Sequence, residues 1–357
     1  MQKALYSLIF LLILFVSCEQ IYHPSIDRVE GRLVVDAQIT NDPAKNFVHL
    51  TRTRSFYDMV PLPEVSGAKV ELIQMGGRSV QAVERNTGYY TFPIVPVTGN
   101  RYYLRITIGV DIYESLAVTM PPIPTLDNFY TLDAVKKVWI NNSDGVPQSF
   151  EKQGREIDVD LALTDSLSHY RFDVRSILEW TWDSIPSAFS MTHTAFGWYS
   201  YYENQQFNLA GPTDFNQVNK IEKHPLLMIS YNAKDYLYAD TLVSQGWILI
   251  IEQYGTSKES YEYHQKLNSQ FAATGSLFDP VTTQVYGNVL CKNDPSKIVY
   301  GFFDLNSCQQ YRYYFNLFSP TAAISLRQIY RYPDIPDNGI VKAAKKKPIV
   351  RPDWWEE

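Results

Sequence analysis

The sequence predicts a mainly β protein with two folded units: an N-terminal immunoglobulin-like β-sandwich and a larger β-rich domain with at least one helix. Three observations support this class. Aromatic residues make up 14% of the 357 residues, including 26 Tyr and 18 Phe, and aromatic side chains favour strands. Short strand-like runs separated by turn residues recur along the chain. One segment has the capping and periodicity of a helix.

The first element is an export signal, residues 1–17, in which Lys3 precedes an apolar run that ends before Cys18. The run is too short to cross a bilayer core of roughly 30 Å as a helix, so we expect a cleaved signal peptide. The sequence Phe15-Val16-Ser17-Cys18 resembles a bacterial lipobox, although Phe15 replaces the commoner Leu. Acylated Cys18 would anchor the chain to outer-membrane lipid. The alternative is an ordinary signal peptide with an incidental cysteine.

The next elements are a polar tether at residues 18–30 and the immunoglobulin-like sandwich at residues 31–120. Turn sequences such as Asn86-Thr87-Gly88 separate its strands. A stiff Pro-rich linker, residues 121–125, ends the unit. The expected strands are 32–40, 46–53, 68–75, 78–83, 88–92, 101–108 and 111–119.

The β-rich C-terminal domain is predicted at residues 126–332, followed by an extended tail at 333–357. Residues 155–165 alternate strictly, which predicts a half-buried strand with Asp158 and Asp160 on its solvated face. Residues 183–222 are less regular. The remaining strands are expected at 129–140, 169–182, 225–231, 246–254, 282–290, 297–305 and 309–318.

One helix is expected between Thr256 and about Ala272. Thr256 and Glu259 have the spacing of a capping box, which satisfies backbone donors at a helix start. Side chains that recur at helical spacing predict its buried face, and Gly275 follows as a stop signal. These side chains are Tyr261, His264, Leu267 and Phe271.

Two cysteines remain beside Cys18, and an even pair in an exported chain favours a disulfide between Cys291 and Cys308. A metal site is the weaker alternative, since two cysteines alone do not make a zinc site. The net charge of −6 argues against a nucleic-acid partner. We therefore expect no metal and no cofactor.

The sequence lacks the common catalytic motifs, including HExxH, GxSxG, the Walker loop and CxxC. Asp158 and Asp160 have the residue types of a glycosidase pair, but a solvated strand face explains them better. Lys345–Lys347 fits a solvated tail, with anionic lipid as the alternative. The six histidines show no chelating spacing and fit packing or surface positions: His23, His49, His169, His193, His224 and His264.

An aromatic cluster is the best candidate for a contact surface, because aromatic side chains combine apolar area with a polar group. The alternative is a core strand that exposes alternate Tyr hydroxyls. The cluster comprises Phe196, Trp198, Tyr199, Tyr201 and Tyr202.

An ordered set of segments resembles a family of Bacteroidota lipoproteins known as domain of unknown function 4249. The strongest match is residues 276–307, with Phe278-Asp279-Pro280, Gly287-Asn288 and Gly301-Phe302-Phe303 at the matching places. The Asp and Gly positions there also fit ordinary turn chemistry. The other matching segments are the lipobox-like residues 15–18, the strand 31–39, residues 60–72, the junction 120–124 and the ending 352–355.

The resemblance implies an envelope lipoprotein, often encoded beside a TonB-dependent transporter, and it supplies no catalytic residues. We therefore expect a non-enzymatic accessory protein of the outer membrane that helps a transporter to capture or present a nutrient. Glu19 directly after Cys18 favours the cell surface over the periplasmic face. The alternatives are an envelope assembly or secretion factor and, less favoured, a glycan or peptide hydrolase with an unrecognised site.

Overall fold

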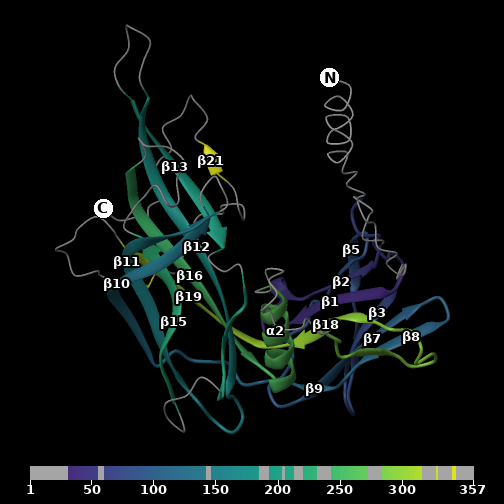
Figure 1. The fold of residues 1–357 in the computed structure, drawn as a ribbon. Helices are drawn as coiled ribbons and strands as arrows, with labels where there is room; N and C mark the ends of the chain where they lie inside the picture. Colours follow the sequence, from purple (N-terminus) through teal and green to yellow (C-terminus); the bar gives the residue numbers. More distant parts are fainter. Residues whose placement is uncertain are drawn as a thin grey trace, which may run out of the picture.

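The computed structural model is mainly β, with several sheets and one α-helix in the residues that it describes (Figure 1). Two groups of sheets form two units, and the helix α2 lies between them. The described residues are 31–54, 60–141, 146–184, 193–202, 206–212, 220–230, 243–271, 284–315, 327–328 and 340–342.

The first unit contains a five-stranded and a six-stranded sheet. In spatial order, the five-stranded sheet comprises β18 (Tyr300–Leu305), β1 (Leu33–Ile39), β2 (Phe47–Arg52), β6 (Tyr89–Thr91) and β5 (Val83–Asn86), and the short helix η1 (Pro43–Lys45) connects β1 to β2. The six-stranded sheet comprises β17 (Val289–Cys291), β8 (Asp111–Ser115), β7 (Arg101–Ile108), β3 (Lys69–Gln74) and β4 (Ser79–Gln81), with β9 (Val118–Thr119) also paired to β7.

Both sheets bury their side chains in one common core. Strand β1 alternates as the sequence predicts, and Val35 and Ile39 are fully buried. Leu104 of β7 and Phe303 of β18 belong to the same core. The mainly β class is confirmed, whereas the immunoglobulin-like topology stays a prediction.

Residues 289–305 complete this first unit, although they lie far outside the predicted range 31–120. Strand β18 pairs in parallel with β1, and β17 pairs with β8. Gly301 makes the first pairing possible, because it has a φ of +86° and an added Cβ would lie 1.9 Å from the carbonyl oxygen of Val35. The chain therefore returns to its N-terminal unit after β16 and α2, and then re-enters the second unit with β19.

The second unit contains a three-stranded and a seven-stranded sheet. The three-stranded sheet has the order β10 (Asn128–Asn141), β11 (Pro147–Ala162) and β15 (Lys220–Ser230). The seven-stranded sheet comprises β20 (Arg327–Gln328), β19 (Ser307–Phe315), β16 (Val243–Thr256), β12 (His169–Ser184), β13 (His193–Tyr202) and β21 (Ile340–Lys342), with β14 (Asn208–Ala210) also paired to β12.

A second core lies between these two sheets, with Val159 of β11, Phe172 of β12 and Ile251 of β16 among its members. The prediction that 183–222 is less regular is wrong for residues 193–202. Those residues form β13, which is antiparallel to β12 over their whole length, because a long neighbouring strand offers its backbone partners.

Helix α2 spans Lys258–Phe271, close to the predicted range, but its start differs from the predicted capping box. The hydroxyl of Ser257 accepts a hydrogen bond from the backbone N–H of Ser260 at 3.1 Å, so Ser257 is the N-cap. Thr256 instead ends β16, where it pairs with His169. Thr256, which the sequence pattern assigned to the N-cap, is thus the last paired residue of a strand.

The predicted Cys291–Cys308 disulfide is absent, and both thiols are free and buried. Cys291 lies in β17 beside Tyr113 of the first unit. Cys308 lies in β19 beside Tyr254 of the second unit. Sequence spacing does not reveal that the two residues belong to different sheets, and a disulfide requires both Cα atoms within about 7 Å of each other.

Within the described part of the chain, no helix combines the length and apolar character needed to cross a bilayer. Cys18 and the predicted signal peptide lie outside the described residues.

Candidate functional site

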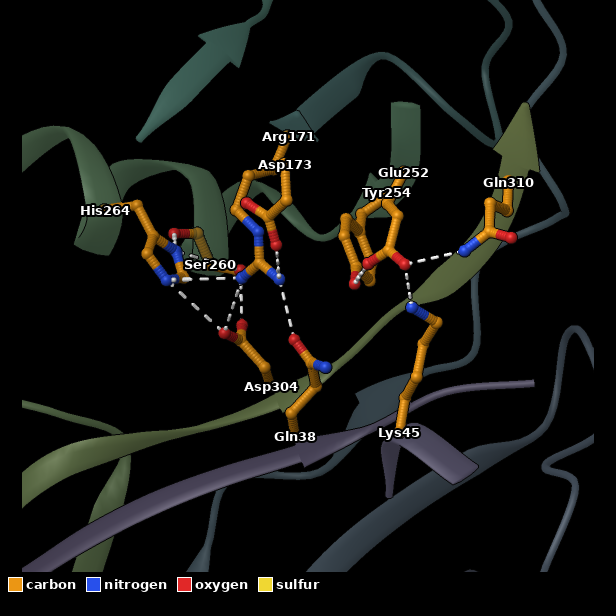
Figure 2. Close-up of polar contacts among 10 residues, drawn as sticks. All are labelled: Gln38, Lys45, Arg171, Asp173, Glu252, Tyr254, Ser260, His264, Asp304 and Gln310. Carbon is orange, nitrogen blue, oxygen red and sulfur yellow. Dashed lines mark hydrogen bonds and ion pairs between the residues drawn. The ribbon is translucent and has the colours of Figure 1, made fainter. Parts of the chain in front are cut away.

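A buried polar cluster joins the two units, and Figure 2 shows its ten residues. We name it the junction cluster. From the first unit come Gln38 of β1, Lys45 of η1 and Asp304 of β18. From the second unit come Arg171 and Asp173 of β12, Glu252 and Tyr254 of β16, Ser260 and His264 of α2, and Gln310 of β19.

Arg171 is the centre of the cluster and is only 5% exposed. Its guanidinium donates to Gln38 Oε1 at 2.7 Å and to Asp304 Oδ2 at 3.4 Å. It also lies over the ring of Tyr254, 4.4 Å from the centroid. Although burial opposes the charged form, Asp173 and Asp304 raise the pKa of Arg171 above its usual range. A buried cation from the second unit is thus neutralised partly by the first.

His264 extends the cluster from helix α2. Its Nδ1 donates to the backbone carbonyl of Ser260 at 2.8 Å, which places the proton of the neutral ring on Nδ1. The other nitrogen, Nε2, lies 3.5 Å from both Arg171 Nη1 and Asp304 Oδ2. Burial lowers the pKa of His264, while Asp304 opposes and Arg171 reinforces that shift. The ring is therefore held in its neutral form near pH 7.

A second ion pair joins the units at Lys45 and Glu252. Burial alone would lower the pKa of Lys45, but the Glu252 carboxylate raises it overall. Likewise, burial would raise the pKa of Glu252, but Lys45 lowers it overall. Tyr254 and Gln310 donate to the same carboxylate at 2.8 and 2.9 Å. Both members of this pair are therefore charged and hydrogen-bonded.

Ser260, His264 and Asp304 have the residue types of a hydrolytic triad, but their geometry does not perform that chemistry. The Ser260 hydroxyl donates directly to Asp304. The Nδ1 proton of His264 is held by a backbone carbonyl, so no basic nitrogen accepts the serine proton. All three residues are buried. The junction cluster fits a structural connection between the units.

The predicted solvated face of Asp158 and Asp160 is wrong, because both side chains are buried, at 5% and 1% exposure. We name Asn128, Tyr130, Asp160, Lys220 and Lys223 the sheet cluster. Asp160 accepts hydrogen bonds from Tyr130 at 2.6 Å, Asn128 at 2.8 Å and the backbone N–H of Lys223 at 2.9 Å, and it pairs with Lys220 at 2.9 Å.

These contacts explain why the two aspartates titrate differently. Burial favours neutral Asp160, but the hydrogen bonds from Tyr130, Lys223 and Asn128 hold its pKa well below the usual range. Burial and then Glu156 raise the pKa of Asp158. The neighbouring strands β10 and β15 supply the polar partners of Asp160, so one strand carries a stable carboxylate without exposing it.

An open groove of about 800 Å³ also lies at the junction of the two units. Met120 and Leu167 give it apolar surface, and Arg101, Glu259 and Lys258 give it both signs of charge. The Pro-rich linker contributes Pro121 and Pro122. The turn before β12 contributes Asp165, Ser166 and Ser168, and β12 itself contributes His169. Small-molecule sites commonly have this size and occur between domains. The groove is the candidate ligand site.

The motif residues Gly287 and Asn288 lie directly before β17 and contact β18, which contains Gly301. The side chain of Asn288 donates to the Phe303 carbonyl at 2.9 Å and accepts from the Phe303 N–H at 2.8 Å. An added Cβ on Gly287 would lie 1.5 Å from the Gly301 carbonyl oxygen. Close backbone approach, rather than a turn, therefore explains these residues.

The remaining predicted site residues lie outside the part of the chain whose side chains the structure describes. The aromatic cluster Phe196, Trp198, Tyr199, Tyr201 and Tyr202 lies along β13, and its side chains are outside the described set. Cys18, Phe278–Pro280 and Lys345–Lys347 are also outside it. Among described residues, no group of three or more His, Cys, Asp and Glu side chains has the arrangement of a metal site.

Sequence reasoning missed Arg171, Asp304 and the groove. Arg171 gave no distinct signal, because Asp173 and Arg175 follow it at alternate positions of the same strand. For Asp304, a lone charge within the apolar run 302–305 was the available signal. It indicates a buried charge without naming its partner.

A model of the family described as Domain of unknown function (DUF4249) matches residues 19–312. Neither the curated proteins nor the solved structures give a match. The family match covers both units, including the junction cluster and the strands that return to the first unit. The chain therefore belongs to the DUF4249 family.

Proposed function

We propose that the protein is a lipid-anchored, non-enzymatic accessory protein of the Bacteroidota outer membrane, which binds a small ligand and partners a TonB-dependent transporter in nutrient capture. The single observation that carries the binding role is the groove of about 800 Å³ between the two units. The lipobox-like sequence that ends at Cys18 supports the anchor. Glu19 supports the cell-surface side.

The groove chemistry suits a polar, uncharged ligand. Arg101 and Lys258 are balanced by Asp165 and Glu259, so the charged side chains around the groove sum to zero apart from His169. Burial, and then Lys258, lower the pKa of His169, which favours its neutral form. Hydroxyl groups from Thr98, Thr119, Ser166, Ser168 and Ser257 supply donors and acceptors.

Affinity purification from gently solubilised outer membranes tests the partnership. We expect the tagged protein to recover one outer-membrane protein in stoichiometric amount. The Cys18→Ala variant should leave the membrane fraction and lose that partner. Recovery of no outer-membrane protein with the wild type would contradict the transporter role. Protease shaving of intact cells tests the surface location.

A groove variant separates ligand binding from partnership. Ala117 lines the groove, so Ala117→Trp should fill part of it. We expect this variant to keep its membrane partner but to lose the growth advantage on the captured nutrient. Val110→Trp is the matched control, because Val110 is 86% exposed in a turn that does not line the groove. A deletion that alters surface architecture while nutrient growth stays intact would favour an assembly or secretion role instead.

A further inference from the structure

Strand β10 is a long sheet edge. It contains 14 residues and, in the described part of the chain, it pairs only with β11. An edge strand leaves one row of backbone N–H and C=O groups available for another strand. Proteins commonly protect edges with proline, bulges, short strands or charged side chains, and of these β10 has the charges of Asp133, Lys136 and Lys137. The β10 sequence contains no proline or glycine, and its pairing with β11 is continuous from Asn128 to Asn141.

The outer half of β10 also exposes apolar side chains. The third strand, β15, begins its pairing at Gly154 of β11, so the β10–β11 ribbon extends beyond the three-stranded part of the sheet. There Val135 is 61% exposed and Trp139 is 68% exposed. A long edge that pairs with no further described strand and exposes apolar side chains is a usual feature of a strand-pairing interface.

We propose that β10 pairs antiparallel with β10 of a second copy of this chain, in the register that places Val135 opposite Val135 of the other copy. The two three-stranded sheets would then form one continuous six-stranded sheet. The partner is inferred from the charge pattern of β10 itself.

Antiparallel geometry restricts the choice of register. Two residues that face each other are either both hydrogen-bonded or both non-hydrogen-bonded, and these states alternate along a strand. A strand that pairs with its own copy must therefore be centred on a residue and not between two residues. The candidate centres near the middle of β10 are Asp133, Ala134, Val135 and Lys136.

Charge complementarity selects Val135 among these centres. In that register Asp133 lies opposite Lys137 of the other copy, and symmetry forms this pair twice. Leu132 then lies opposite Val138, so apolar residues also match. Centring on Asp133 or on Lys136 places like charges opposite each other. Centring on Ala134 places Leu132 opposite Lys136.

The exposure of the Asp133 side chain fits this role. Asp133 pairs with Arg155 at 3.1 Å, yet its side chain remains 74% exposed. Asp133 can therefore accept a hydrogen bond from Lys137 of the other copy while it keeps its ion pair with Arg155.

Site-specific crosslinking tests the register in the full chain, purified in mild detergent. Val135→Cys should give a covalent dimer with a short bifunctional maleimide, because symmetry places the two thiols opposite each other. Val110→Cys, an exposed control in the turn between β7 and β8, should not. Equal crosslinking of the two variants, or a wild type that stays monomeric in analytical ultracentrifugation, would overturn the proposal.

A charge-exchange experiment keeps the test independent of misfolding. Lys137→Asp and Asp133→Lys should each weaken homodimerisation by about tenfold or more, because each creates two like-charge pairs. An equimolar mixture should recover dimers that contain one chain of each variant, since both charge pairs then become attractive again. A mixture that stays as dissociated as the separate variants would show that charge pairing across β10 does not hold two copies together.

Discussion

The junction cluster and the sheet cluster both bury charged groups, but they do so in different ways. The sheet cluster surrounds Asp160 with partners from β10 and β15, the two neighbours of its own strand. The junction cluster surrounds Arg171 with groups from β1, β18, β16 and α2, which lie far apart in the sequence. The first stabilises one sheet, whereas the second depends on the docking of two units.

This difference predicts where the molecule is most sensitive to substitution. A buried ion that loses its partner retains the full cost of its desolvation, whereas an exposed pair contributes little. The junction cluster buries two charged groups, Arg171 and Asp304, whereas the sheet cluster buries Asp160. Disrupting the junction cluster should therefore lower the free energy of unfolding by the larger amount.

The largest effect is expected for Arg171→Met, which leaves Asp304 buried without its cation. We expect the free energy of unfolding in urea to fall by about 3–5 kcal/mol. Arg105→Met is the matched control, because the Arg105–Glu114 pair keeps partial access to solvent and should contribute no more than about 1 kcal/mol. Combining Arg171→Met with Asp304→Leu should recover much of the loss. A single-variant loss equal to that of the control would contradict a buried role for Arg171.

The next effect is expected for Asp160→Asn. The neutral amide cannot accept from all of the donors that surround Asp160, so we expect a loss of about 2 kcal/mol in the same urea experiment. Asp165→Asn, at an exposed turn, should change stability little. If Asp160→Asn exceeded Arg171→Met in cost, the proposed ranking of the two clusters would be reversed.

A smaller and separable effect is expected from pH. Burial lowers the pKa of His264 below its ordinary value of 6.5, so the unfolded chain binds the proton first as the pH falls. The contribution of neutral His264 to the free energy of unfolding is complete above pH 6.5 and is lost as the pH falls toward the pKa of His264 in the folded state. Asp160 has a lowered pKa relative to 3.8, so its contribution is lost only below that pH.

Thermal unfolding at a series of pH values checks this order. The decline in melting temperature just below pH 6.5 should become shallower in His264→Gln, with His169 accounting for part of the remainder. The decline below pH 3.8 should become shallower only in Asp160→Asn. An unchanged slope between pH 6.5 and 5 in His264→Gln would exclude His264 as the titrating group.

The smallest effect is expected for the cysteines. The reactivity of the buried Cys308 thiol reports on the packing at the junction. Burial raises the pKa of Cys308 to about 12, so this thiol should resist alkylation at pH 8 in the folded protein and react in denaturant. Arg171→Met should accelerate the reaction by loosening the junction. In mass spectrometry, treatment with a reductant should leave the mass of the wild-type protein unchanged, because both thiols are free. A mass gain of two hydrogens on reduction would instead support a Cys291–Cys308 disulfide.

Local patterns predicted much of the secondary structure. The alternation in Leu33–Ile39 and the helical spacing of Tyr261 and His264 correspond to buried faces in the structure. The prediction is wrong for the end of the helix, where Leu267 is half-buried and Phe271 is 59% exposed. The same patterns failed for Asp158 and Asp160, because period-2 alternation identifies two faces without telling whether the second is also covered. Thr256 was misassigned because a capping pattern and a strand end look alike in sequence.

The sequence by itself determined the β-rich class, the family, the position of the single described α-helix and the lipobox-like Cys18, because these depend on composition, periodicity and short motifs. Only the tertiary structure decided that β18 returns to β1, that Arg171 meets Asp304 and that Cys291 and Cys308 lie in different sheets. Those contacts join residues separated by more than a hundred positions or depend on which sheet a strand enters. The spacing of residues in the sequence reveals neither the long-range contacts nor the sheet that each strand joins.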